Sequence, residues 1–264
     1  MVTQPTRPDH SSYPDSAIPG VAPADFRLGG DGLPPEAIAK VHERFLAYLS
    51  EKRATFLGYQ LGQELEYKEV LKDYLDFHVN NIGDPFQHGN MTTNSKWLER
   101  AVLDYYAALW NARWPHDEDD PESYWGYITS MGSTEANLYA LWNARDYLSG
   151  KALREDFDEY DQHLLYRSPT PETYNPKAYT PVLFYSSDTH YSIVKVALVL
   201  GIQTFHSIAR QNYGDAHNPL RPGRPWPSEV PSTETGETDL DALAKLVEFF
   251  AAEGYPILIC LNYG

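Results

Sequence analysis

Apolar strands that run directly into amphipathic helices are the feature that most constrains the fold of this chain. The strand predicted at Pro181–Ser186 passes through Asp188-Thr189-His190 into a helix with apolar residues at helical spacing. Trp125–Met131 is predicted to be another buried strand, and a helix follows it at once from Ser133. Further elements are predicted as strands at Gly201–His206 and Pro256–Leu261 and as a helix at Asp239–Glu253.

This order of elements predicts an α/β fold in which a mainly parallel sheet carries helices on both faces. Ligands of such sheets bind beyond the carboxyl ends of the strands. The turns that follow Trp125–Met131 and Pro181–Ser186 are therefore candidate sites. Because no closing element follows the last predicted strand, we expect the sheet to be incomplete at its carboxyl end.

Three regions are predicted along the chain. Residues 1–34 are rich in Pro, Gly and small polar residues without a hydrophobic period, so we expect a flexible amino-terminal arm. Residues 35–115 are predicted to be a helical segment, and residues 116–264 the first part of a large ligand-binding domain. Helices of the second region are predicted at Pro35–Glu51, at Tyr67–Val79 and around Leu98–Leu109, the last capped by Asn94 or Ser95. The stretches Glu155–Thr180 and Ser207–Thr238 are predicted to be surface insertions.

The charge balance and the single cysteine limit the partners and the compartment. Of the 264 residues, 21 are Lys or Arg and 37 are Asp or Glu, so nucleic acid or an anionic membrane would be repelled. No apolar signal segment begins the chain, and no run approaches the ~18 apolar residues of a membrane span. Cys260 has no partner thiol, which favours a cytoplasmic setting. The histidines form no metal-binding signature, so no metal site is predicted.

The turn Gly132-Ser133-Thr134 has two possible roles. Its backbone N–H groups, its hydroxyls and the start of a helix suit the binding of a phosphate dianion. Alternatively, Ser133 or Thr134 caps the helix and Glu135 completes a capping box. By itself the turn favours the capping interpretation.

His190 is similarly ambiguous by itself, since a histidine at a helix start is commonly a partly exposed residue with a local hydrogen bond. It lies, however, on the second strand-to-helix turn of the predicted sheet. One flat heteroaromatic phosphate could place its phosphate at Gly132-Ser133-Thr134 and stack its ring on the imidazole. Pyridoxal phosphate has that shape.

At this point several stretches together resemble one family, the group II pyridoxal-phosphate-dependent amino-acid decarboxylases. The resemblance is to the bacterial histidine-decarboxylase-like branch, which includes enzymes for valine and methionine. The matching stretches stand in family order within residues 40–206: Phe56–Tyr59, Asn80–Phe86, Trp125–Thr129, Met131–Leu138 and Ser187–Ser192.

The resemblance implies an enzyme of fold type I, which is like aspartate aminotransferase, and a role in amino-acid metabolism. Such an enzyme decarboxylates an aliphatic or histidine-like L-amino acid with pyridoxal 5'-phosphate, and two copies build the active site at a homodimer interface. Residues 116–264 would begin its large cofactor-binding domain. Gly132, Ser133 and Thr134 would hold the phosphate, while His190 would stack on the pyridine ring and act near the substrate carboxylate.

The resemblance also implies that Gln60 and the turn at Asn81 line the mouth that selects the substrate. In the alternative interpretation Gln60 is a surface residue and Asn81 merely ends a helix. Ser133 and Ala136 stand where the family commonly has glycine, a mild change because the backbone donors remain.

Other family residues are expected beyond Gly264: the aspartate that pairs with the pyridine nitrogen, the Schiff-base lysine and the catalytic-loop tyrosine. Lys195 matches no Schiff-base motif and is expected to be an exposed helical lysine. Two alternatives to the decarboxylase remain. One is a non-catalytic fragment or subunit of the same fold that contributes half an active site, and the other is an unrelated α/β protein that binds a phosphate ligand.

Overall fold

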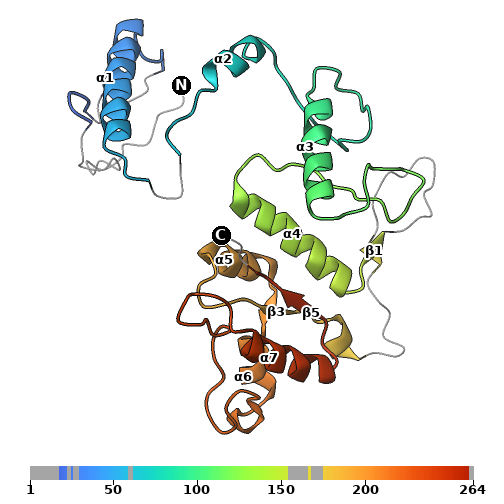
Figure 1. The fold of residues 1–264 in the computed structure, drawn as a ribbon. Coiled ribbons are helices and arrows are strands. Elements are labelled where there is room, and N and C mark those ends of the chain that lie inside the picture. Colours follow the sequence, from blue (N-terminus) through green and yellow to red (C-terminus); the bar gives the residue numbers. More distant parts are fainter. Residues whose placement is uncertain are drawn as a thin grey trace. The chain divides into compact units, whose positions relative to one another are not determined.

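The computed structural model describes residues 18–22, 25, 30–58, 62–153, 166–167 and 175–261. The chain forms two compact units, residues 1–80 and residues 81–264, and Figure 1 traces their elements in chain order. No helix in the described ranges is long and apolar enough to cross a membrane. The predicted arm lies mostly outside the described residues, and the predicted region borders at residues 34 and 115 stay predictions.

The first unit contains the helix predicted at Pro35–Glu51, which the structure confirms as α1 (Pro35–Ala54). Pro35 begins it. The basic residues Lys52 and Arg53 lie in its last turn, where their positive charges interact favourably with the negative end of the helix dipole. The helix predicted at Tyr67–Val79 is wrong in length. Only α2 (Lys68–Leu71) and the 3-10 turn η2 (Lys72–Tyr74) form. Val70 and Leu71 remain exposed, so no packed face stabilises a longer helix.

The second unit begins with a loop and α3 (Lys96–Leu109), the third predicted helix. Both proposed capping residues lie at its start: Ser95 occupies the N-cap position, and the side chain of Asn94 accepts a hydrogen bond from the Lys96 N–H at 3.2 Å. The prediction of this helix is confirmed, and its N-cap position is one of the two that the sequence indicated, although the Ser95 side chain makes no capping hydrogen bond.

The strand predicted at Trp125–Met131 is wrong. None of its residues belongs to a sheet of the described chain, and the side chains of Trp125 and Ile128 are 54% and 47% exposed. The Ile128 N–H donates instead to the carboxylate of Glu99 at 2.9 Å. An aromatic, β-branched composition fits a strand, but only a neighbouring strand can satisfy its backbone, and the described chain places none beside it.

A three-stranded parallel sheet forms the centre of this unit, with the strand order β4-β3-β5. β3 (Val182–Phe184) pairs in parallel with β4 (Gln203–Thr204) on one side and with β5 (Ile257–Ile259) on the other. A separate antiparallel pair joins β1 (Ala152–Leu153) to β2 (Tyr166–Arg167). The parallel sheet confirms the predicted α/β class.

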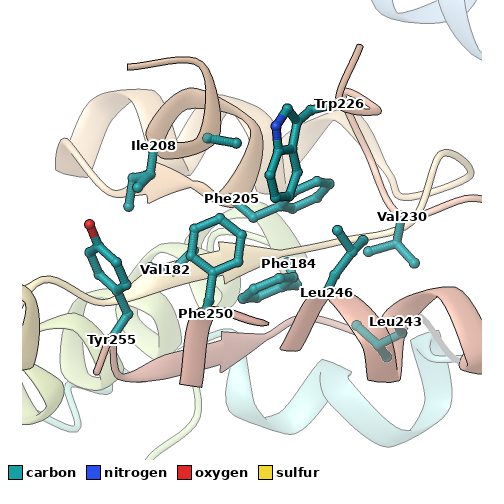
Figure 2. Packing of buried hydrophobic residues seen from close by; sticks show 11 residues of the cluster. Val182, Phe184, Phe205, Ile208, Trp226, Val230, Leu243, Leu246, Phe250 and Tyr255 are labelled. Atoms are coloured by element: carbon teal, nitrogen blue, oxygen red, sulfur yellow. The ribbon is translucent and has the colours of Figure 1, made fainter. Parts of the chain in front are cut away.

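The central strand β3 is buried on both faces. Val182 and Phe184 face a cluster built from α6 (Phe205–Asn212) and α7 (Leu240–Ala252), shown in Figure 2. Leu183 faces the other cluster, built from α4 (Ser133–Leu148) and α5 (Tyr191–Leu200). Because successive side chains of a strand point to opposite faces, this one short strand holds a helical layer on each side.

Two predictions for residues 201–238 need correction. The strand predicted at Gly201–His206 is shorter, because the Thr204 hydroxyl accepts a hydrogen bond from the Ser207 N–H at 3.2 Å and starts α6 directly after β4. The stretch Ser207–Thr238 is not only a surface insertion. It contains most of α6 and the 3-10 turn η5 (Asp215–His217), and its Trp226 and Val230 are buried in the core of Figure 2.

The other predicted insertion, Glu155–Thr180, lies largely outside the described residues. Its described parts are β2 and the 3-10 turn η4 (Pro176–Tyr179), which ends just before β3. The remaining predicted helix and strand, Asp239–Glu253 and Pro256–Leu261, are confirmed as α7 and β5.

Truncation of Phe184 is expected to destabilise the second unit strongly. Its fully buried ring stacks on Phe205 with centroids 5.2 Å apart, so Phe184→Ala should lower the free energy of unfolding by about 3–5 kcal/mol in urea denaturation. Leu198→Ala, on the exposed side of α5, is the matched control and should change it by about 0.5 kcal/mol or less. Equal losses in the two variants would contradict the proposed core.

Candidate functional site

Both predicted strand-to-helix turns lie at helix starts on the same face of the sheet. The first turn begins α4 and the second lies between β3 and α5. α4 and α5 pack against each other through the cluster that contains Leu141 and Ile193. The second turn also follows the carboxyl end of β3, which is the edge where ligands of parallel sheets bind.

The start of α4 is open for a ligand. Gly132 occupies the N-cap position with φ +92° and ψ 170°, and no side chain caps the helix. The capping interpretation is therefore wrong: Ser133 and Thr134 are the first residues of the helix. Glu135 reaches back to accept a hydrogen bond from the Met131 N–H at 2.9 Å. The Glu135 N–H donates to the Gly132 carbonyl at 3.0 Å, so the N–H groups of Ser133 and Thr134 and the positive end of the helix dipole remain to receive an anion.

Glycine is needed at position 132 because of its backbone conformation, and not because a side chain would lack space. Its φ and ψ fall in a region that is essentially restricted to glycine. A Cβ atom at this position would meet no heavy atom within 4 Å. The turn is thus open around Gly132, and its conformation depends on this one residue.

His190 occupies the N-cap of α5 with an exposed ring. The Ser192 N–H donates to its Nδ1 at 3.3 Å, and the Ser192 hydroxyl lies 2.9 Å from the same atom. A backbone N–H can only donate, so Nδ1 accepts and the neutral ring carries its proton on Nε2. The opposite edge of the imidazole is then a hydrogen-bond donor.

Asn137 joins the two turns. It lies on α4, and its Nδ2 donates to the Ser192 hydroxyl at 2.9 Å. Ser192 itself is 1% exposed, so this bond lies in the packed interface between α4 and α5. A chain of hydrogen bonds therefore runs from α4 through Asn137 and Ser192 to the ring of His190. It fixes the position of the imidazole relative to α4, whose N-cap is Gly132.

Sequence reasoning gave no role to Asn137 or Ser192. The only available signal was that each polar side chain follows its turn by a few residues and falls on the apolar face of its helix. Buried polar residues in such positions have hydrogen-bond partners, but the sequence alone does not say which.

The end of β3 is fixed from a distant part of the chain. The Val230 N–H donates to the Tyr185 carbonyl at 2.9 Å, and the Ser187 N–H donates to the Val230 carbonyl at 3.0 Å. Burial raises the pKa of the Tyr185 phenol, so this side chain is neutral at physiological pH. The turn that carries His190 thus starts from a rigid, uncharged support.

Of the two predicted substrate residues, only Asn81 lies in the described part of the chain, and its hydrogen bonds are with the start of α3. Gln60 lies outside the described residues. The Asn81 amide is engaged at the start of α3: its Oδ1 accepts from the Ser95 N–H at 2.7 Å and its Nδ2 donates to Glu99 at 3.0 Å. The role of both residues in substrate selection stays a prediction. Lys195 is exposed on α5, as expected.

A second cluster of titratable groups lies at the opposite edge of the sheet, before β3 and β5. Lys177 donates to Glu253 at 2.5 Å and to the Tyr213 hydroxyl at 3.0 Å. The hydrogen bond with Glu253 raises the pKa of Lys177, and the same bond lowers the pKa of Glu253. The positive charge of Lys177 is neutralised by the negative charge of Glu253 within the cluster, which is typical of a structural ion pair. Among the described residues no group of three or more His, Cys, Asp or Glu side chains could hold a metal.

Known proteins similar to this chain are amino-acid decarboxylases, although no family model matches it. A histidine decarboxylase of Solanum lycopersicum is 34% identical over 167 residues, covering 62% of this chain and 32% of the relative. A histidine decarboxylase of Vibrio campbellii is 28% identical over 226 residues, covering 86% of this chain and 42% of the relative. The crystal structure of L-methionine decarboxylase from Streptomyces sp. 590 is 46% identical with a TM-score of 0.78, covering 91% of this chain and 46% of that one.

The chain is a homologue of the group II pyridoxal-phosphate-dependent amino-acid decarboxylases. The same methionine decarboxylase has also been solved in an internal aldimine form, to which this chain aligns with a TM-score of 0.77. The predicted resemblance to this family and the fold-type I class are thereby confirmed. The chain spans less than half of the length of these decarboxylases. The roles given to Gly132, Ser133, Thr134 and His190 stay predictions.

Removal of the Ser192 hydroxyl is expected to release the His190 ring. Ser192→Ala leaves the Asn137 amide without its partner, so the free energy of unfolding should fall by about 1–3 kcal/mol. The ring should also become more mobile, because Nδ1 then keeps only the 3.3 Å hydrogen bond from the backbone N–H of residue 192, and NMR relaxation of the imidazole ring measures this mobility. Ser187→Ala removes a hydroxyl from the exposed part of the same turn and is the control. Unchanged stability and unchanged mobility of the ring in Ser192→Ala would contradict the proposed chain of hydrogen bonds.

Proposed function

We propose that the protein decarboxylates an aliphatic or histidine-like L-amino acid to the amine and carbon dioxide with pyridoxal 5'-phosphate. The observation that carries the proposal is the chain of hydrogen bonds from α4 through Asn137 and Ser192 to His190. It couples an open helix start, suited to a phosphate, to an exposed imidazole, suited to an aromatic ring. The relatives named for histidine, serine and methionine support the reaction type.

The residues at the start of α4 fit the phosphate of the cofactor. Gly132 leaves the approach open, and the N–H groups of Ser133 and Thr134 belong to the uncapped first turn. Their hydroxyls add donors on the same turn. A phosphate dianion there is stabilised by the helix dipole and by charge-assisted hydrogen bonds. α4 extends from Ser133 to Leu148, which is long enough for its peptide dipoles to add up.

His190 fits the pyridine ring. Its imidazole is exposed and is held from the Nδ1 side by Ser192, so one face can pack on a flat ligand. Stacked aromatic rings contribute about 0.5–1.5 kcal/mol beyond the area they bury. With Nδ1 accepting, the Nε2–H is available to a substrate carboxylate or to the cofactor.

Pyridoxal phosphate supplies the electron sink that accepts the electron pair released when carbon dioxide leaves. The residues of this chain bind and orient. The start of α4 fixes the phosphate, and His190 limits the directions in which the substrate carboxylate can lie beside the ring. Orientation of this kind lowers the barrier because the reacting bond is held in a productive geometry before reaction.

Further parts of the proposal concern the assembled protein. We place Gln60 and Asn81 at the mouth that selects the substrate, and we propose a cytoplasmic homodimer with the active site at its interface. The aromatic surface of α3 and of the residue after it supports association, since Trp97 and Trp110 are each 73% exposed. Large exposed apolar residues that gather on one element are typical of interfaces.

In the full-length protein, His190→Ala is expected to weaken cofactor binding and to slow turnover further. Loss of stacking should lower the affinity for pyridoxal phosphate about three- to tenfold in a fluorescence titration. The turnover number should fall more, up to about a hundredfold, because the substrate carboxylate is no longer aligned. His190→Phe keeps a ring without nitrogens, so it should retain more cofactor affinity than His190→Ala and still turn over slowly.

Lys195→Ala is the control for the same helix, since Lys195 is exposed on α5. It should leave both affinity and turnover near those of the unmodified protein. Unchanged affinity and turnover in both His190 variants would show that His190 only caps a helix, and the site assignment would be wrong.

Gly132→Ala is expected to disrupt the phosphate cradle. An alanine at φ +92° and ψ 170° is strained, at a cost of about 1–3 kcal/mol, so the affinity for pyridoxal phosphate should fall about 5- to 150-fold. Gly201→Ala is the matched control: Gly201 also has positive φ, +66°, and open space around a Cβ, but it ends α5. Equal losses of affinity in the two variants would point to general destabilisation and against a phosphate site at Gly132.

A further inference from the structure

The start of α3 lies between two segments that the sequence motifs single out. One is the loop Asn81–Gly89, and the other is the run Trp125–Met131 that leads into Gly132. Both belong to the second compact unit. Side chains of α3 hold the two segments, and one of these side chains contacts both.

The loop is held by a buried lysine. The Nζ of Lys96 donates to the carbonyls of Asp84 at 2.7 Å and Gln87 at 2.9 Å. Lys96 is only 5% exposed. A buried ammonium is tolerated only where its donors are satisfied, so these carbonyls fix the loop around it. Arg100 adds a hydrogen bond to the Phe86 carbonyl.

The second segment is held by carboxylates. The Trp125 indole donates to Asp84 at 3.2 Å, and the Ile128 N–H donates to the Oε1 of Glu99 at 2.9 Å. Since this run has no partner strand in the described chain, these contacts replace sheet hydrogen bonds. Its path toward Gly132 therefore depends on them.

Glu99 connects the loop to the run. Its Oε2 accepts from the Asn81 Nδ2 at 3.0 Å, while its Oε1 accepts from the Ile128 N–H. The Asn81 amide cannot turn over freely, because its Oδ1 accepts from the Ser95 N–H at 2.7 Å. Both neighbours of the Glu99 carboxylate are consequently fixed donors.

We propose that Glu99 is a positioning residue that sets the start of α4, and with it the turn Gly132-Ser133-Thr134, from the loop that begins at Asn81. The part of this inference that concerns the cofactor rests on the proposed function. Glu99 would touch neither cofactor nor substrate. It acts through Ile128, and the run from there ends at the helix start, where Glu135 holds the Met131 N–H.

The test uses the different hydrogen-bonding capacities of a carboxylate and an amide of the same shape. Glu99→Gln keeps one acceptor oxygen and places an NH₂ group against one of two donors, Asn81 Nδ2 or the Ile128 N–H. Asn81→Asp alone places two carboxylates in contact. Each single variant should therefore loosen the link.

The double variant Asn81→Asp with Glu99→Gln should restore the link. The new amide donates to the new carboxylate and accepts from Ile128, and the other oxygen of the new carboxylate still accepts from Ser95. The net charge is that of the unmodified protein. Glu248→Gln, an exposed position on α7, is the control for loss of a carboxylate alone.

Two measurements are made on the purified protein: hydrogen exchange of the amides from Ile128 to Glu135, and titration with pyridoxal phosphate. Both single variants should exchange faster in this segment and bind about three- to tenfold more weakly, while β3 exchanges as before. The double variant should recover both properties. Recovery by reciprocal exchange of the two groups is not expected if either substitution merely destabilises the fold.

Unchanged exchange from Ile128 to Glu135 in the single variants, or no recovery in the double variant, would overturn the positioning role. Faster exchange that the double variant reverses, with no change in cofactor affinity, would support the positioning role and overturn the cofactor role of the turn. Failure of the link and failure of the proposed function are thus distinguishable. If a single variant does not fold, the positioning role is still tested by comparing the double variant with Glu248→Gln. Only an intact link between residues 81, 99 and 128 lets the double variant match the unmodified protein in amide exchange and cofactor affinity.

Discussion

The burial of β3 on both faces is the constraint on which the rest of the second unit depends. Val182, Leu183 and Phe184 are all fully buried, and their alternation places one helical layer on each side of the sheet. α5 begins just beyond the end of this strand, and α4 packs on α5. The positions of both helix starts, and so of the candidate site, follow from this packing.

Hydrogen bonds between side chains fix the relative positions of the helices and turns more closely than apolar packing alone. Apolar contacts have no preferred direction, whereas a buried polar group must keep its hydrogen-bond partner. Ser192, 1% exposed, meets this condition between Asn137 and His190. Glu99 plays the corresponding part between the loop at Asn81 and the run at Ile128. In the proposed function, these polar links would align the start of α4 with the ring of His190.

Local patterns predicted those elements whose stabilising partners are close in sequence. α1, α3, α4, α5 and α7 were identified from their spacing of apolar residues and from residues at their starts. The failures share one physical cause. The run Trp125–Met131 has strand composition without a partner strand, Tyr67–Val79 has helical periodicity without a face to pack on, and Ser207–Thr238 resembles a loop but supplies Trp226 and Val230 to the core. Each depends on contacts with distant residues, which local propensity does not contain.

The sequence by itself determined the fold class, the family resemblance and the two turns with their candidate residues, because strand-turn-helix order and short motifs are local properties. Only the tertiary structure excluded capping of α4 by Ser133 or Thr134, since whether a side chain caps a helix depends on backbone angles. It also revealed that Asn137 and Ser192 connect the turns, and that Asn81 is engaged with α3. These partners are separated in the sequence and meet only because tertiary packing, between α4 and α5 and around the start of α3, brings each of these polar groups to its hydrogen-bond partner.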